Sequence, residues 1–391
     1  MQIGNMQVIK KQTKNKGVRY LYRQNFMDNG KRYVESVTLD SITKGAQKRA
    51  QIMLWEKFQD RGKAEKEKAE AASKTTLAEA CCQWLDMDKD LVKGQTHDGH
   101  TMCTRQLLKR LPDGILTRDF TPTLAEKILG RMYYTEKLCY GSILKMLAVI
   151  RGVMRYAEKQ GIIENAKPFA DIHIKKRSAT RQEIEKRQNK FLNPDELKQV
   201  LRQLSKIDER IALICEFQSL TGLRIGELLA LRVQDVDLAK KTININGGMV
   251  RLANKGYYRD TPKNIYSVRT ISINARCVHI IQWFMTDNKR LASWTNTYQD
   301  QGYIFTGMHG KPTYILTINN ALRQVQLPGK HITSHIFRHT HISMLAAANV
   351  PVKAIMKRVG QNNPNTTLQI YTHVTESMEK DLAEKLERMS I

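Results

Sequence analysis

Acidic residues are scarce in this sequence of 391 residues. It contains 38 Asp and Glu against 64 Lys and Arg, which gives a formal net charge of +26. An excess of positive charge this large raises the local concentration of polyanions and speeds encounter with them. We therefore consider nucleic acid as the first partner and an anionic membrane surface as the second.

Long apolar runs are missing too. No run approaches the roughly 20 apolar residues that a membrane-spanning helix needs, and residues 1–11 lack the apolar centre of a signal peptide. The length of the chain and its 41% hydrophobic content allow two or three domains with ordinary packed cores. We expect a cytoplasmic protein without a membrane partner.

Two common cofactor patterns are absent from the sequence. The six cysteines show no CxxC and no paired spacing of zinc ligands, which argues against a disulfide framework or a zinc ribbon. Nothing matches the phosphate-binding loop GxxxxGK[ST], so nucleotide hydrolysis has no support. We therefore expect reduced thiols and neither a metal nor a nucleotide cofactor.

The first segment, residues 1–65, has the pattern of a small antiparallel sheet followed by a helix. Val18, Tyr20 and Tyr22 alternate with Arg19, Leu21 and Arg23, and a turn at residues 28–30 precedes a second run at residues 32–38. A helical pattern begins near Thr43 and decays into the charged residues 63–68, which suit a solvated helix end or a linker. We place the first domain boundary there.

The second segment, residues 75–172, is predicted to be all-α with four or five helices. Thr76 and Thr123 each stand three residues before a glutamate, which is the spacing of a capping box at a helix start. A long apolar pattern of helical period ends at Gly161. The basic stretch that follows, residues 175–190, is the second candidate linker.

The third segment, residues 188–391, is predicted to be mainly α with a small antiparallel sheet inside it. Asn193, Pro194 and Glu196 give it a firm helix start, because they suit the N-cap and the first turn. The period changes to two at residues 242–246, 257–262 and 267–273, and then returns to helix. An apolar stripe over residues 378–389 predicts a tail helix.

Four short pieces of the third segment carry residues that share one kind of chemistry. They are Thr221-Gly222-Leu223-Arg224-Ile225-Gly226-Glu227, Thr261-Pro262-Lys263, His335-Ile336-Phe337-Arg338-His339 and Tyr371-Thr372-His373. Taken singly, each has an ordinary explanation: a surface ion pair for the arginine, a solvated hairpin lysine, or a core position for the tyrosine. Only their combination and order point to a function.

As a set, these pieces resemble the tyrosine recombinases, the phage integrase family, over residues 191–373. The resemblance implies catalytic roles for Arg224, Lys263, His335 and Arg338, a supporting role for Glu227, and Tyr371 as the nucleophile. One position departs from the family pattern, because Gln361 stands where the family usually carries His or Trp. The implied activity is DNA cleavage and rejoining through a 3′-phosphotyrosyl bond, without cofactors.

The residue types suit attack on a phosphodiester. Negative charge develops on the equatorial oxygens, and the guanidiniums of Arg224 and Arg338 can bind these oxygens through charge-assisted hydrogen bonds. A tyrosine hydroxyl is a weak acid, so attack at neutral pH needs a base or positive surroundings. His335 can supply the base, and it shares one face of a helix with Arg338, which we expect Ser334 to cap.

Three further residues have supporting tasks in this scheme. Lys263 would protonate the leaving 5′ oxygen, and Glu227 would hold Arg224 or His335 in place. Gln361 has an amide N–H to donate to the phosphate, but it carries no charge. The phosphotyrosyl bond stores the energy of the broken link, so rejoining needs no ATP.

A metal site is the main local alternative for this segment. His331, His335 and His339 recur every four residues, and such a stripe can bind a metal ion. There is no HExxH motif, however, and Arg338 would place a like charge beside the ion. We therefore assign no metal ligands.

The two outer segments also resemble parts of integrases. Residues 1–65 resemble arm-type DNA-binding domains with a three-stranded sheet plus a helix, with Arg19, Arg23 and Lys31 as candidate DNA contacts. Residues 75–172 resemble the helical core-binding clamp. This three-domain order implies integration and excision of a mobile element, by a homotetramer on double-stranded attachment sites. The resemblance further implies a place near the bacterial nucleoid and, as optional partners, a DNA-bending protein and an excisionase.

Two rival functions remain open at this point. A catalytically silent DNA-binding regulator would keep the fold, but the complete set of candidate catalytic residues argues against it. A topoisomerase-like enzyme would nick and close DNA with the same chemistry and no partner site. Trapping a covalent protein–DNA adduct on candidate sites distinguishes the first rival from an active enzyme.

Overall fold

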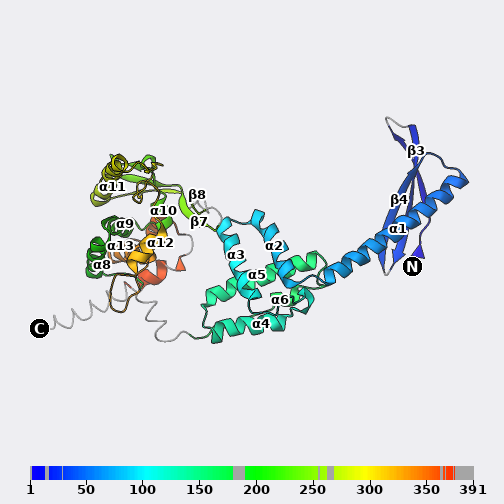
Figure 1. Cartoon of the computed structure of the whole chain (residues 1–391), viewed down its shortest axis with the longest axis horizontal. Helices are drawn as coiled ribbons and strands as arrows, with labels where there is room; N and C mark the ends of the chain where they lie inside the picture. The colour runs from blue at the N-terminus through cyan, green and yellow to red at the C-terminus, as the bar shows by residue number, and fades with distance from the viewer. Residues whose placement is uncertain are drawn as a thin grey trace. The chain divides into compact units, whose positions relative to one another are not determined.

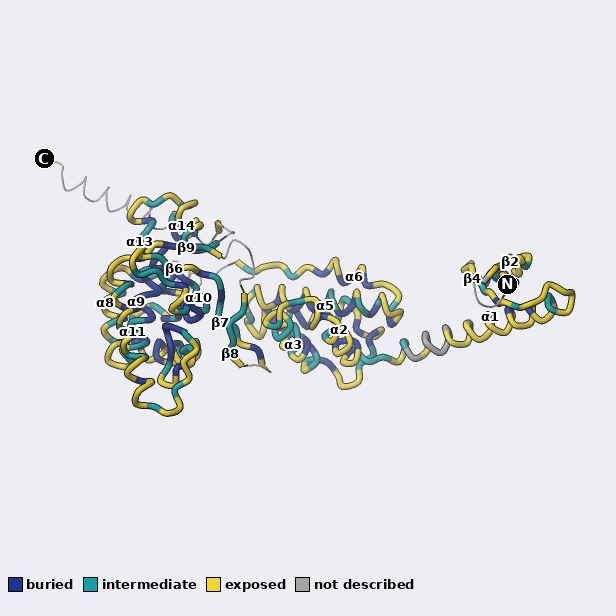
Figure 2. The backbone as a smooth tube through the Cα atoms, turned by 90° about the horizontal axis from the view of Figure 1, so that it is seen from above, coloured by how far each residue is buried: buried dark blue, intermediate teal, exposed yellow. Residues whose placement is uncertain are grey.

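The computed structural model describes residues 2–13, 17–28, 30–178, 190–253, 256–261, 268–361, 364–365, 367–372 and 374. The chain divides into two compact units, residues 1–176 and 177–391. Buried side chains gather in separate clusters along the chain, which the dark segments of Figure 2 mark. The expected order of a sheet-and-helix part, a helical part and a mainly helical part that contains some strands is present (Figure 1).

An antiparallel sheet opens the first unit. It contains β1 (Gln2–Ile3), β2 (Gln7–Thr13), β3 (Gly17–Asp28) and β4 (Lys31–Leu39). β1 was not expected, but β1 and β2 both pair with the edge of β3 that faces away from β4. The sheet is therefore three strands wide, and its first strand is interrupted at residues 4–6.

A long helix, α1 (Lys44–Ser73), covers one face of this sheet. Its buried residues Ala50, Leu54 and Phe58 pack against Tyr22 and Phe26, and the rings of Phe26 and Phe58 stack at 4.6 Å. The boundary expected near residue 65 falls inside this helix, because α1 runs on to Ser73 without a break. Of the two interpretations of the charged stretch, the helix end is correct.

The rest of the first unit is helical, as predicted. It contains α2 (Leu77–Leu91), α3 (Gly94–Leu108), η1 (Thr117–Asp119), α4 (Pro122–Gly130), the π-helical turn η2 (Arg131–Thr135), α5 (Tyr140–Lys159) and α6 (Lys167–Ala170). α2 and α5 approach closely, since a Cβ at Gly152 would lie 2.7 Å from the ring of Trp84. The capping box of Thr76 and Glu79 is confirmed.

The predicted cap at Thr123 is wrong. Thr121 is the N-cap of α4, and its hydroxyl accepts from the backbone N–H of Leu124 at 3.2 Å. Pro122 explains the shift, because proline suits the first position of a helix, where no N–H is needed. The helix therefore starts two residues earlier than the capping-box spacing suggested.

The second unit is mainly helical. It contains α8 (Pro194–Ile207), α9 (Glu209–Thr221), α10 (Ile225–Leu229), η3 (Val233–Asp235), α11 (Ala275–Trp294), α12 (Ile315–Leu322), α13 (Ser334–Ala347) and α14 (Val352–Val359). The capping box of Asn193 and Glu196 is confirmed. The cap expected at Ser334 is wrong, because Ser334 is the first residue of α13 and Thr333 is its N-cap.

The strands of the second unit form two sheets instead of the single one expected. They are β5 (Val236–Asp237), β6 (Thr242–Ile245), β7 (Gly248–Leu252), β8 (Gly256–Asp260) and β9 (Arg269–Ser272). β5, β6 and β9 make one sheet, and β7 and β8 make a hairpin. The strand β7 was not expected, because its sequence has no clear period. It pairs with β8, and this pair forms the second sheet.

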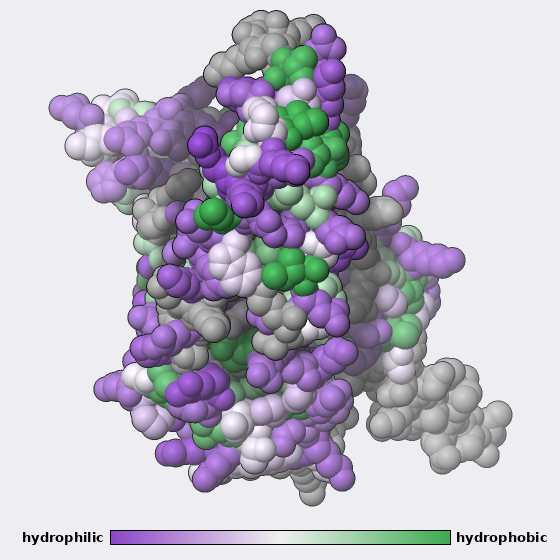
Figure 3. Space-filling model, turned by 90° about the vertical axis from the view of Figure 1, so that its right-hand side faces the viewer, coloured by the Kyte–Doolittle hydropathy of each residue, from purple (hydrophilic) through white to green (hydrophobic). Residues whose placement is uncertain are grey.

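None of the helices within the described ranges combines the length and the apolar character needed to cross a membrane. The face of the molecule seen in Figure 3 is largely hydrophilic, and hydrophilic side chains separate its hydrophobic patches. The tail helix expected at residues 378–389 lies outside the described residues.

Candidate active site

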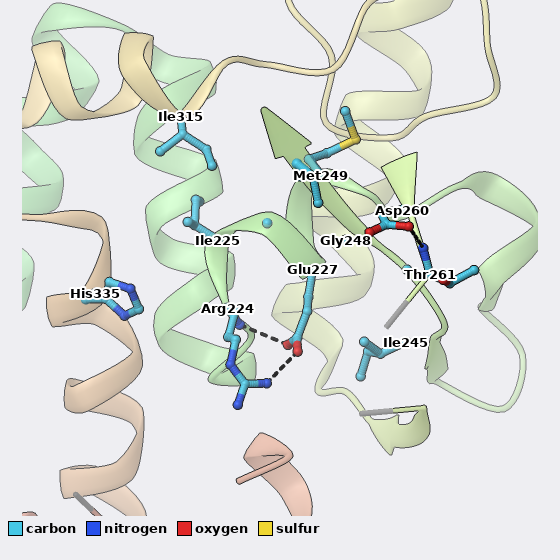
Figure 4. A pocket seen from close by; sticks show the side chains of 13 residues that line it. Arg224, Ile225, Glu227, Ile245, Gly248, Met249, Asp260, Thr261, Ile315 and His335 are labelled. Atoms are coloured by element: carbon cyan, nitrogen blue, oxygen red, sulfur yellow. Dashed lines mark hydrogen bonds and ion pairs between the residues drawn. The ribbon is translucent and has the colours of Figure 1, made fainter. Parts of the chain in front are cut away.

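A cavity of about 400 Å³ opens beside α10 in the second unit. Its lining comprises Arg224, Ile225, Gly226, Glu227, Ile245, Gly247, Gly248, Met249, Val250, Asp260, Thr261, Ile315 and His335. Most of the lining is apolar, and the candidate catalytic side chains Arg224, Glu227 and His335 provide much of the polar part (Figure 4). The cavity therefore brings together three residues that lie up to 111 positions apart in the chain, from 224 to 335.

Arg224 is placed by the sharp turn between α9 and α10. Gly222 ends α9 in the left-handed region at φ 69°, and Arg224 is the N-cap residue of α10. Its Nη1 donates to Oε1 of Glu227 at 2.7 Å, and its Nη2 donates to the carbonyl of Gly360 at 2.8 Å. With 39% of the side chain exposed, Arg224 keeps donors available to the cavity.

Glu227 is a buried carboxylate held by two arginines. Nη2 of Arg269 donates to its Oε2 at 3.0 Å, opposite the bond from Arg224. Burial alone would raise the pKa of Glu227, but the hydrogen bonds and charges of Arg269 and Arg224 lower it below its usual value. Glu227 therefore stays ionised and contacts Arg224, whereas no contact links it to His335 among those described.

Arg269 was missed by the motif comparison. It begins β9 and shares its side of the strand with the buried Ile271. A charged residue on the apolar side of a period-two pattern is unusual, and this was the available signal. Its side chain is only 8% exposed.

Arg338 is the most deeply buried of the candidate arginines, with 3% exposure. It projects from α13, and its guanidinium donates to the carbonyls of Gly222 at 2.7 Å and Val359 at 2.8 Å. Burial, followed by the charge of Arg224, lowers the pKa of Arg338 to about 9. It remains positively charged at neutral pH.

Three arginines hold three consecutive carbonyls at the end of α14. Arg358 receives a hydrogen bond from Arg269 at 2.8 Å, Val359 from Arg338, and Gly360 from Arg224. The C-terminus of a helix carries partial negative charge and unpaired carbonyls, which attract cations. This helix end therefore gathers the guanidiniums and fixes the position of the next residue, Gln361.

Gln361 is tied to the segment that carries the candidate nucleophile. The hydroxyl of Thr367 donates to Oε1 of Gln361 at 2.7 Å, and Thr367 is fully buried. With Oε1 occupied, the NH₂ group is the end of the amide available to a ligand. This arrangement supports the expected donor role.

Tyr371 lies on a short helical stretch, residues 367–372. It packs against a hydrophobic cluster that includes Ile342 of α13 and Val359 of α14. Tyr371 thus packs on α13, which carries Arg338, and on α14, which carries Val359, one of the two carbonyl partners of Arg338. Lys263 lies outside the described residues.

His335 projects from α13 toward the part of the cavity where Arg224 lies (Figure 4). Partial burial, followed by the charges of Arg338 and Arg224, lowers the pKa of His335 below its ordinary value of 6.5. A neutral imidazole at physiological pH can accept a proton. Its ring lies 6.3 Å from that of His339, and no group of three or more metal-ligating side chains occurs within the described ranges.

The candidate DNA contacts in the sheet of the first unit divide between its two faces. Arg19 and Arg23 share the face that α1 leaves uncovered, and Arg19 forms an ion pair with Asp40 at 2.8 Å. Lys31 lies over the ring of Tyr33, on the side of α1. The strand register adds Lys11 and Arg32 to the uncovered face, and the sequence alone did not single these out.

Two guanidiniums, a neutral imidazole and an anchored tyrosine suit an enzyme that acts on a phosphate group. The sequence model of the Phage integrase family matches residues 190–378. The chain is 39% identical to the integrase of Staphylococcus phage L54a, over 63% of this chain and 74% of that protein. It is 32% identical to the prophage ps2 probable integrase of Lactococcus lactis, over 90% of this chain and 92% of that protein.

Solved structures share the fold. The integrase of the Tn1549 transposon, in complex with a circular intermediate DNA, superposes with a TM-score of 0.60 at 20% identity, covering 78% of this chain and 99% of that one. A lambda integrase dimer bound to a core site gives 0.53 at 14% identity, covering 89% and 92%. The chain is a site-specific recombinase of the tyrosine type. It belongs to the phage integrase family.

Proposed function

We propose that this chain integrates and excises a mobile element by cutting and rejoining double-stranded DNA at attachment sites. The observation that carries the proposal is the meeting of Arg224 and Arg338 at the end of α14, with neutral His335 beside Arg224. Two guanidiniums supply several N–H donors, and charge-assisted hydrogen bonds to phosphate are strong. The relatives named as integrases and the neighbouring structures that hold DNA support the same substrate.

In the proposed reaction, the Tyr371 oxygen attacks the phosphorus and its proton passes to Nδ1 or Nε2 of His335. Arg224 and Arg338 bind the non-bridging oxygens, and the amide of Gln361 adds one neutral hydrogen bond. The bond to the 5′ oxygen breaks, and Lys263 protonates this leaving group. The product is a 3′-phosphotyrosyl bond plus a free 5′ hydroxyl. Attack by a 5′ hydroxyl reverses the steps, so no external energy is needed.

The uncovered face of the N-terminal sheet is the proposed arm-site contact. Lys11, Arg19, Arg23 and Arg32 occupy it, and the register assigns no acidic residue to this face within β2, β3 and β4. Asp40, which follows β4, pairs with Arg19, so three of the four cations keep their charge without a carboxylate partner from these strands, and a face with a net positive charge attracts phosphates. We therefore propose this face, without Lys31, as the arm-DNA surface.

The proposed assembly follows the segments of the chain. An arm-binding domain covers residues 1–65 and continues along α1, a core-binding clamp covers residues 75–172, and the catalytic domain covers residues 188–391. Two DNA-binding parts on one protomer allow it to hold two sites, as an integrating complex requires. A homotetramer on DNA, with a DNA-bending protein and an excisionase as partners, completes the proposal.

The decisive experiment compares the wild-type chain with Tyr371→Phe on nicked attachment-site DNA, which traps the cleaved state. Wild type should form a covalent protein–DNA adduct, and Tyr371→Phe should bind equally but form none, because it lacks only the attacking oxygen. DNA binding without an adduct from wild type would favour the silent regulator. Adduct formation without strand exchange between two sites would favour the topoisomerase-like enzyme.

A further inference from the structure

We propose that Arg269 is a positioning residue for DNA cleavage, which holds Glu227 and the last turn of α14 together and thereby places Arg224 and Gln361. The proposal rests on the proposed function, because it concerns the rate of the same cleavage. Arg269 itself does not line the cavity among the residues described, so it acts through its neighbours.

The contacts of Arg269 use its planar fork on two different partners. Nη2 and Nη1 lie 3.0 and 3.4 Å from the two carboxylate oxygens of Glu227, and Nε donates to the carbonyl of Arg358 at 2.8 Å. Only a guanidinium presents donors in this fixed arrangement, since a lysine ammonium is a single point. Arg269 therefore joins β9, α10 and α14 at one place.

Gly360 shows how closely this guanidinium packs. The residue has a left-handed backbone at φ 67°, and a Cβ built on it would lie 2.6 Å from Nη1 of Arg269. The carbonyl of Gly360 accepts from Arg224. The backbone just before Gln361 is thus confined between two arginines, and a shift of Arg269 would move it.

The charges around Glu227 show that Arg269 also has an electrostatic role. The carboxylate is 10% exposed and faces Arg224 and Arg269, with Arg338 as a further cation nearby. If Arg269 were removed, a buried anion would keep one close partner, and Arg224 would be drawn more strongly toward it and away from a phosphate. Arg269 therefore binds the Glu227 carboxylate together with Arg224, and Arg224 keeps N–H donors for the substrate.

Arg210 offers a matched control in the same unit. It is also a buried arginine, with 12% exposure, and it pairs with Asp287, Asn288 and the carbonyl of Thr306. None of these residues lines the cavity or contacts the end of α14 among the described interactions. Arg210→Lys therefore reproduces the generic loss of a buried arginine without the proposed linkage.

The first test compares Arg269→Lys with Arg210→Lys in single-turnover cleavage of nicked site DNA. We expect Arg269→Lys to slow cleavage by on the order of 10- to 100-fold, the range for loss of hydrogen bonds to a charged group, with DNA affinity nearly unchanged. Arg210→Lys should lose stability at least as much but cleave near the wild-type rate. Equal rates for the two variants, after correction for the folded fraction, would overturn the proposal.

The second test asks whether Arg269 acts through Glu227. In a double-mutant cycle, Arg269→Met combined with Glu227→Gln should cost clearly less than the product of the two single effects, because both remove the same link. Below the pH at which His335 protonates, protonation of Glu227 should cause a second loss of rate. This second loss should begin at higher pH in Arg269→Met, where Glu227 protonates more easily, and stay nearer wild type in Arg269→Lys, which keeps a charge. Independent effects with an unmoved second loss would reject the linkage.

The wild-type result in the same assay distinguishes failure of the Arg269 proposal from failure of the proposed DNA cleavage on which it rests. Absence of adduct with wild type on cognate DNA rejects the proposed cleavage, and the role of Arg269 with it. Adduct from wild type together with unimpaired cleavage by Arg269→Lys rejects only the role of Arg269.

Discussion

The hydroxyl of Thr367 donates a hydrogen bond of 2.7 Å to the side-chain oxygen of Gln361. Thr367 stands one helical turn before Tyr371, so this bond ties the nucleophile segment to the end of α14. It also orients the amide, because an occupied oxygen leaves the NH₂ group to donate. At the position where the resemblance to the family predicts His or Trp, this chain thus has an amide whose oxygen is held by Thr367.

The first prediction concerns this donor. Gln361→Ala should slow single-turnover cleavage by about tenfold to a few tens of fold, as expected for one neutral hydrogen bond of about 1 kcal/mol or somewhat more. Gln361→His should keep substantial activity, since a ring N–H can take the same place. Thr367→Val, which keeps the shape and removes the hydroxyl, should show part of the Ala effect.

The alternative is that Gln361 only packs the loop before Tyr371. In that case Gln361→Ala would lower the melting temperature more than the cleavage rate. Thr367→Ser is the matched control, because it keeps the hydroxyl and should cleave faster than Thr367→Val. Normal cleavage by Gln361→Ala would end the donor role.

The second prediction concerns the phosphate clamp. Arg224→Lys keeps the charge but loses the planar fork, so cleavage should fall by on the order of 100-fold while site binding stays nearly intact. Arg276→Lys is the control, because Arg276 makes a two-point pair with Glu216 at 2.7 and 2.8 Å outside the cavity. Single-turnover rates and adduct yields check this, and near-normal cleavage by Arg224→Lys would remove the clamp role.

Motif order predicted the family, because Arg224, His335, Arg338 and Tyr371 stand in a distinctive sequence. Helix caps were predicted well where one residue decided them, as at Asn193, and less well where two candidates competed. Thr121, and not Thr123, is the N-cap because Pro122 occupies the first helical position. The class and most elements could therefore be obtained from local patterns.

Contacts between distant segments could not be obtained in this way. The role of Arg269 depends on β9 lying beside α14, 89 residues later at Arg358. The strand period placed Arg269 on a buried side, but nothing local named its partners. The same holds for Lys31, whose strand register, fixed by pairing with β3, turns it away from Arg19 and Arg23.

The third prediction concerns the uncovered face of the sheet. Lys11→Gln and Arg23→Gln should each weaken binding to arm-site DNA and reduce the slope of log affinity against log salt by about one. Lys48→Gln on α1 is the control and should change neither. Filter binding at several salt concentrations measures the slopes, and a Lys31→Gln effect larger than that of Arg23→Gln would contradict the assignment of faces. Core-site cleavage should be unaffected throughout.

The last prediction concerns His341, which is buried behind the arginines at 4% exposure. Its Nδ1 lies 2.9 Å from the carbonyl of Ser219, and its Nε2 accepts from Nε of Arg358 at 3.0 Å. The neutral ring suits both contacts, whereas a protonated ring would place a second N–H against a guanidinium. Burial, followed by the charge of Arg358, lowers the pKa of His341 to about 4.

The sign of the pH effect follows from this shift. Between pH 6.5, the ordinary histidine value, and pH 4, the unfolded chain binds a proton that the folded chain does not. The contribution of His341 to stability is therefore full above pH 6.5 and falls as the pH decreases, by about 2 kcal/mol between pH 7 and pH 5. The protection factors of the α13 amides, which are exchange rates corrected for the intrinsic effect of pH, should decrease accordingly.

His341→Asn tests the assignment, because its amide can still donate to Ser219 but does not titrate. This variant should be less stable than wild type at pH 7, yet its α13 protection factors should depend less on pH between 7 and 5. The effect of His339 must be distinguished from that of His341, since burial lowers the pKa of His339 to about 4 as well. His339→Asn should therefore remove a further part of the dependence of stability on pH. If His341→Asn kept the full wild-type slope, the neutral buried imidazole would not be the source of the acid sensitivity.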